Sequence, residues 1–308
     1  MRPRVALFAL CLAATAAQAR ARWRVTSSPA ADRWFTAMAR LALPTPGALA
    51  YYEPAAAPPP WRARVARTPA FEVLHFVPLW YPSGTATDLT AAVRAAALDR
   101  AEPTPRAAFL VAALRRSIAP ADRAALLRVA ALVDSAEVPG VPATRLASLQ
   151  AVWDSAYAPA LAPYLASRRL DGGVLFVSPP LGAEGRIFEG VPADRHDNVL
   201  AVGVARGSAV DEAPLLAAVR ETCAPLVTEL AADHRVWRDD PAAAGRATVR
   251  CGAALLDRAL PARSAAYRVL WAWHAGARRY TDAFPPNAAE DAAIDAALRR
   301  AFAAHDVR

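Results

Sequence analysis

The chain has 308 residues, of which 55% are hydrophobic, enough for one elaborate domain or two small ones. Its formal net charge is +8, and all 36 basic residues are arginines that are scattered among acids. No basic tract with interleaved aromatic residues occurs, which argues against a nucleic-acid-binding protein.

Residues 1–19 have the features of a secretory signal peptide. Two arginines are followed by an apolar stretch over residues 5–14, and Ala17-Gln18-Ala19 is a small-x-small cleavage site. The apolar stretch is too short to cross a bilayer, which takes roughly 20 residues. Charged residues or prolines interrupt every later apolar run. We therefore expect an exported protein, periplasmic or secreted, with no membrane span.

Residues 20–170 are predicted to form a helical N-terminal region that begins with a basic, extended stretch. Ser28 and Pro29 are favourable starting residues for a helix that ends near Leu43. Residues 71–78 are rich in aromatic and β-branched side chains and predict a strand, with a buried helix as the alternative. Further helices are expected at 61–68, 85–100, 105–118, 119–135 and 142–170, the last broken or kinked at Pro159 and Pro163.

Residues 171–308 are predicted to form a small sheet and then further helices. An apolar run at 172–177, flanked by glycine and proline, indicates a buried strand. Two more strands are expected at 186–191 and 198–204. Helices are expected at 209–233, 247–260, 262–275 and 288–305. This order predicts a mostly helical α+β fold.

The segment 219–225 resembles the zinc-binding helix of a metalloprotease without its zinc ligands. The usual motif is His-Glu-x-x-His, in which the two histidines hold the metal and the glutamate acts as general base. Arg220 and Ala224 occupy the two histidine positions, and Glu221 alone remains. A protonated guanidinium has no lone pair for zinc, and an alanine side chain has no donor atom.

The order of segments around this motif is similar to a family of exported bacterial proteins of unknown function that resembles gluzincin metallopeptidases. The matching segments are 34–43 with 50–52, 71–75, 177–182, 216–227 and 251–263. The resemblance implies a zincin-like fold, with a small sheet before the motif helix. In the family the last segment carries the third ligand, a glutamate. The resemblance places Ala254, or a neighbour, at that position, with Asp257 as the nearest acid.

Loss of all three ligands implies a catalytically inactive zincin-like protein, a binding or structural module without metal or cofactor. Its former cleft would hold an extended peptide against the edge of the sheet, and Glu221 would be structural. One alternative is an active peptidase or other hydrolase, either misaligned here or with a site rebuilt from Glu221, His234 and Asp257. Another is a helical exported protein unrelated to zincins.

Two cysteines remain after the signal peptide, Cys223 and Cys251. An even pair in an oxidising compartment favours a disulfide, and two buried free thiols are the alternative. Because the motif helix of a zincin packs on the third-ligand helix, the resemblance implies that these two residues lie close together. A separate expectation concerns Trp271 and Trp273. Residues two apart on a helix face different ways, so we expect one ring in the core and the other partly exposed.

Overall fold

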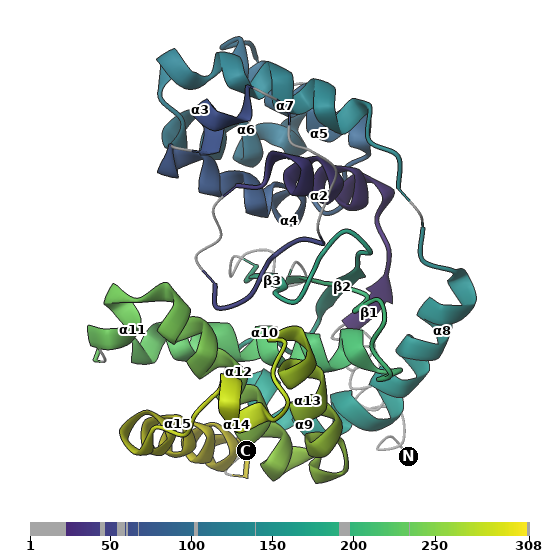
Figure 1. Cartoon of the computed structure of the whole chain (residues 1–308). Helices are drawn as coiled ribbons and strands as arrows, with labels where there is room; N and C mark the ends of the chain where they lie inside the picture. Colours follow the sequence, from purple (N-terminus) through teal and green to yellow (C-terminus); the bar gives the residue numbers. More distant parts are fainter. Residues whose placement is uncertain are drawn as a thin grey trace, which may run out of the picture.

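The computed structural model describes residues 23–43, 47–53, 59, 61–66, 68–101, 104–138, 140–190, 198–233 and 235–306. The expected signal peptide at residues 1–19 lies outside this part of the chain, as does His234. The described residues form a mostly helical structure with one small sheet (Figure 1), which confirms the α+β fold class. Within the described part, no helix is both long and apolar enough to cross a membrane.

The sheet has four short strands in the order β1-β2-β4-β3. They are β1 (Trp23–Thr26), β2 (Gly173–Val177), β3 (Arg186–Phe188) and β4 (Val199–Val202). The first three in spatial order run parallel, and β3 lies antiparallel to β4 at the edge. The sequence predicted β2, β3 and β4, but it indicated only an extended stretch where β1 forms.

Helical layers cover both faces of the sheet (Figure 1). Side chains alternate between the faces along each strand, so Phe176 and Ala201 contact the N-terminal helices while Leu175 and Leu200 contact the later ones. Because both faces are buried, the central strands are almost wholly apolar.

The layer on one face is built from the N-terminal helices. Ser28 caps the first of them, as the sequence predicts, by accepting a hydrogen bond from the Ala31 amide at 3.2 Å. Thr85 and Asp88 form a capping box at the start of another. The layer comprises α2 (Pro29–Leu41), α3 (Arg62–Ala66), α4 (Val77–Trp80), α5 (Ala86–Ala97), α6 (Ala108–Ser117) and α7 (Ala124–Asp134).

The strand predicted at residues 71–78 is wrong, and the helical alternative is correct. Pro69–Phe76 forms a 3-10 helix that continues directly into α4. Phe71, Leu74 and Val77 are all buried. Their spacing of three places them on one face of a 3-10 helix. The aromatic and β-branched composition of the segment thus reflects burial rather than strand pairing.

The other layer contains α8 (Ala143–Val152), α9 (Ala158–Ser167) and the C-terminal helices. A π-helical turn, Trp153–Tyr157, joins α8 to α9. It lies just before Pro159, which has no N–H to donate to the preceding turn. The helix is therefore irregular at the proline where the sequence predicted a break or kink. The C-terminal helices are α10 (Ala213–Leu230), α11 (Arg235–Asp239), α12 (Pro241–Ala259), α13 (Pro261–His274), α14 (Tyr280–Ala283) and α15 (Ala288–Asp306).

The hydrophobic core does not divide at residue 170, where the sequence suggested a boundary. Trp153, Tyr157, Leu161 and Leu165 lie on one face of the α8–α9 segment and are buried in the same cluster as the C-terminal helices. The spacing of four residues places these apolar side chains in one stripe along the segment. The N-terminal cluster therefore spans α2 to α7, while β1, α8 and α9 pack with residues 171–306.

Candidate functional site

The motif residues lie in the middle of α10, which packs between the sheet and α12. Arg220 is 5% exposed and Glu221 2% exposed, so both charged groups are removed from water. A charge buried to this degree needs a partner of opposite sign. The structure supplies such partners for Arg220.

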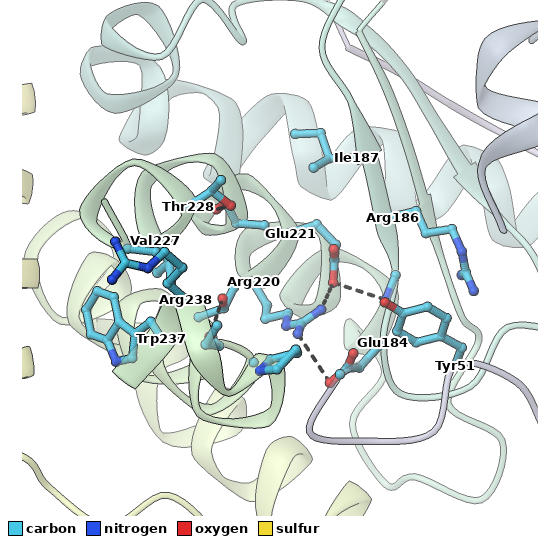
Figure 2. A pocket seen from close by; sticks show the side chains of 18 of the residues that line it. Tyr51, Glu184, Arg186, Ile187, Arg220, Glu221, Val227, Thr228, Trp237 and Arg238 are labelled. Atoms are coloured by element: carbon cyan, nitrogen blue, oxygen red, sulfur yellow. Dashed lines mark hydrogen bonds and ion pairs between the residues drawn. The ribbon is translucent and has the colours of Figure 1, made fainter. Parts of the chain in front are cut away.

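Arg220 is held between two carboxylates (Figure 2). One guanidinium nitrogen lies 3.3 Å from Oε1 of Glu184, and the other forms an ion pair with Oε1 of Glu221. The indole ring of Trp271 lies 5.8 Å from Cζ of Arg220, within range of a cation–π contact. Burial alone would lower the pKa of Arg220, but Glu221 and Glu184 raise it above the ordinary value. The guanidinium is therefore permanently charged.

Backbone amides fix both carboxylates. The Gly185 amide donates to Oε1 of Glu221 at 3.0 Å, and the Leu49 amide donates to Oε1 of Glu184 at 2.8 Å. A Cβ atom at residue 185 would lie 2.5 Å from the Ala201 carbonyl oxygen and 2.8 Å from Cγ of Glu221, so glycine is required there. Burial raises the pKa of Glu184, and the charge of Arg220 opposes that rise.

A cavity of 650 Å³ lies beside this charged group. One end is polar and contains Arg220 and Glu221. Toward the other end, Figure 2 shows Val227 of α10 and Trp237 of α11 with Arg238 beside them, and Ala231 is a further apolar lining residue. Gly185, Arg186 and Ile187 also line it, so the cavity runs along the edge strand β3.

Residues 47–53, here named the strap, connect the cavity to the loop between β2 and β3. The Gly182 amide donates to the Tyr51 carbonyl at 2.7 Å, and the Ala183 amide donates to the Ala50 carbonyl at 3.1 Å. At its other end the strap touches α12, where a Cβ at Gly245 would lie 2.7 Å from the Ala48 nitrogen. The strap thus lies between the sheet loop and α12, and Tyr51 lines the cavity.

The remaining predicted site residues have different positions. Ala224 lines the cavity. Ala254 is half-buried, packs against the hydrophobic cluster of the C-terminal layer and is not among the cavity-lining residues. On α12 the lining residues are Pro241, Ala244, Gly245 and Thr248. All four precede Ala254 on this helix.

The structure does not bring together the rebuilt metal site considered from the sequence. Asp257 pairs with Arg268 at 2.6 Å and does not line the cavity with Glu221. His234, the third member of that site, is outside the described residues. Across the residues that the structure describes, no group of three or more His, Cys, Asp or Glu side chains lies where it could hold a metal ion.

Cys223 on α10 and Cys251 on α12 are adjacent in the core. Their Sγ atoms are 2.6 Å apart, and both are fully buried free thiols. Burial raises the pKa of Cys251 above the ordinary thiol value. Of the two tryptophans on α13, Trp271 is fully buried and Trp273 is 43% exposed, which confirms the expected division.

Glu184 and Arg186 are members of the site that the sequence analysis did not find. Both lie in or next to β3, and both are almost completely buried. Charged residues at the start of a short predicted strand are common on protein surfaces. The sequence offered one signal for a special role of Arg186, which is that it follows Gly185 at the start of a predicted strand.

Comparison of the chain with protein-family models, curated proteins and solved structures found no match.

Proposed function

We propose that this chain is an exported, zincin-like protein that has lost its metal site and acts as a binding module. The observation that carries the proposal is the buried guanidinium of Arg220, paired with both Glu184 and Glu221. A metal ion bound there would face a permanent positive charge, and displacing the guanidinium would leave it buried without its partners.

The environment of Glu221 also supports a structural role. Its Oε1 atom already accepts from the Gly185 amide and pairs with Arg220. A general base must reach the proton of a water molecule that a metal or another group has activated. Glu221 instead joins α10 to the residue that precedes β3, so we assign it to the stability of the fold.

The proposed ligand is an extended peptide that lies along β3. This strand is at the edge of the described sheet and borders the cavity. The main chain of an edge strand can pair with an added strand, while pockets beside it accept alternate side chains. The apolar end of the cavity, with Val227, Ala231 and Trp237, suits an apolar side chain of such a peptide.

A mixed peptide library tests the proposal with the mature protein. We expect saturable binding and no cleavage. The variant Thr228→Trp should weaken binding, because Thr228 is exposed and lines the cavity. Ala166→Trp, at an exposed position on α9, is the matched control and should bind like the parent. Equal binding by both variants would contradict the peptide site.

Cleavage provides the test of the rival peptidase hypothesis. Hydrolysis by the parent protein that disappears in an equally stable Glu221→Gln variant would contradict the proposed inactive site. A melting curve for each protein establishes equal stability before the assay. We expect the opposite pattern, in which Glu221→Gln lowers the melting temperature and neither protein hydrolyses the library.

A further inference from the structure

Arg186 is a buried cation without a conventional partner. Its side chain is 2% exposed, and none of its three guanidinium nitrogens donates to a carboxylate or a backbone carbonyl among the described residues, which leaves the Tyr52 hydroxyl as its polar neighbour. Native proteins rarely leave buried charged donors unpaired, and such a group calls for a specific explanation. Arg220, only a short distance away across the cavity lining, shows the usual arrangement with two carboxylates.

Three aromatic rings surround the Arg186 guanidinium. Its Cζ atom lies 4.2 Å from the ring centre of Tyr51, 4.8 Å from that of Tyr52 and 5.3 Å from that of Phe35. Aromatic faces stabilise a cation, but they do not accept its in-plane N–H groups as a carboxylate or phosphate would. The cage therefore holds the planar guanidinium in place without giving it an anionic partner.

Tyr51 separates this guanidinium from the rest of the cavity. It stacks on Arg186 and also lines the cavity, and Figure 2 shows its ring between the Arg186 side chain and the Glu184 carboxylate. Burial raises the pKa of Tyr51 to about 12, so the phenol is neutral and adds no negative charge at neutral pH. Because Arg186 also lines the cavity, a ligand there would meet the Tyr51 ring and the guanidinium side by side.

The other charged groups that line the cavity already have partners. Arg220 pairs with Glu184 and Glu221, and Arg238 lies 3.6 Å from Asp239. Within the described part of the lining, Arg186 is the arginine that has no acidic partner. A ligand that enters the cavity would therefore meet one unsatisfied positive charge.

We infer that Arg186 is the anchor for an oxyanion, a carboxylate or a phosphate, that enters through the cavity past Tyr51. The planar guanidinium matches both groups through paired N–H donors. The anion site does not depend on peptide binding. Only the source of the carboxylate rests on the proposed function, because a peptide along β3 would bring its terminal or side-chain carboxylate to this residue.

The first test uses acetate and inorganic phosphate as probes of the mature protein at constant ionic strength, with chloride as the reference salt. We expect at least one probe to raise the melting temperature saturably. The Arg186→Met variant should weaken that binding about 10- to 100-fold, the usual loss for a hydrogen bond to a charged group. Ala166→Trp, at an exposed position on α9 outside the cavity lining, should retain binding. No saturable shift in the parent protein, or an equal shift in Arg186→Met, would overturn the inference.

Circular dichroism shows whether Arg186→Met folds. If it does not, Arg186→Lys is the replacement, because it keeps the charge and loses the paired donor geometry. Its binding should be weaker than that of the parent. Unchanged anion binding in a folded Arg186→Lys variant would contradict the proposed paired contact.

The second test separates the two proposals by using one library peptide in free-acid and C-terminally amidated forms. Tighter binding of the free acid, lost in Arg186→Met, supports Arg186 as the anchor of a terminal carboxylate. Equal binding of both forms with no saturable effect of acetate or phosphate would refute the anion site. If Thr228→Trp still weakened the peptide in that case, the peptide proposal would stand.

Discussion

Arg220 on α10 and Glu184, which precedes β3, lie 3.3 Å apart in the core although no local sequence pattern connects them. The pair joins α10 to the residues that precede the edge strand β3. Its significance is electrostatic. A guanidinium supplies one fixed positive charge to two buried carboxylates, so this region is neutralised in part without a metal.

Removal of Arg220 should be strongly destabilising. Arg220→Met would leave Glu184 and Glu221 buried without their cation, and breaking a buried pair in this way typically costs about 3–5 kcal/mol. Denaturant unfolding of the parent and variant measures the change. A loss of less than about 1 kcal/mol, the range of exposed ion pairs, would contradict the described burial and pairing.

Glu221→Gln should have a smaller effect than Arg220→Met, about 1–3 kcal/mol, because the amide oxygen can still accept from Gly185. The double variant should lose less than the sum of the two single losses, since both changes disrupt the same contact. The same unfolding experiment gives all three values. Strict additivity would show that the two side chains do not interact.

Asp32 should make stability depend on pH. It is buried on α2, where the Ser178 hydroxyl donates to its carboxylate, and burial raises its pKa from 3.8 to about 6. The folded state then binds the proton more tightly than the unfolded state. This group's contribution to stability is therefore complete below pH 4 and is lost as the pH rises through 6.

The Asp32→Asn variant measures that contribution. Relative to this variant, the parent should lose about 2 kcal/mol of unfolding free energy between pH 4 and pH 7, which is most of the energy equivalent of the pKa shift. Asparagine retains a hydrogen-bonding oxygen for Ser178. Parallel stability curves for the two proteins across this range would rule out a raised pKa for Asp32.

The cysteine pair should form a disulfide in an oxidising compartment. The two Sγ atoms are 2.6 Å apart, so a small side-chain adjustment would reach the bond length of about 2.05 Å. Closing a loop between residues 28 apart should stabilise the fold by roughly 3 kcal/mol. Thiol labelling in denaturant should detect no free cysteine until reductant is added. Two labelled thiols without reductant would show that the pair stays reduced.

The sequence predicts those parts of the fold that depend on local patterns. Ser28 and Pro29 indicate the start of α2, and the apolar run at 172–177 indicates β2. It does not predict β1, because those residues become a strand only by pairing with β2, far along the chain.

The same limit applies to the site. Glu221 and Arg220 could be singled out from their motif, but Glu184 becomes a partner only when the loop before β3 packs on α10. The sequence singled out Ala254 on α12, whereas the α12 residues that line the cavity are Pro241, Ala244, Gly245 and Thr248. The register between two long helices depends on packing, which periodicity alone does not determine.

The metal content of the purified protein is the most direct test of the proposed loss of the zinc site. The protein should be purified, exposed to zinc, dialysed against a weak chelator and analysed by elemental mass spectrometry. We expect far less than one zinc per chain, because the guanidinium of Arg220 already supplies the positive charge beside Glu184 and Glu221. Retention of about one tightly bound zinc per chain would contradict it, since structural and catalytic zinc sites hold the ion through such treatment.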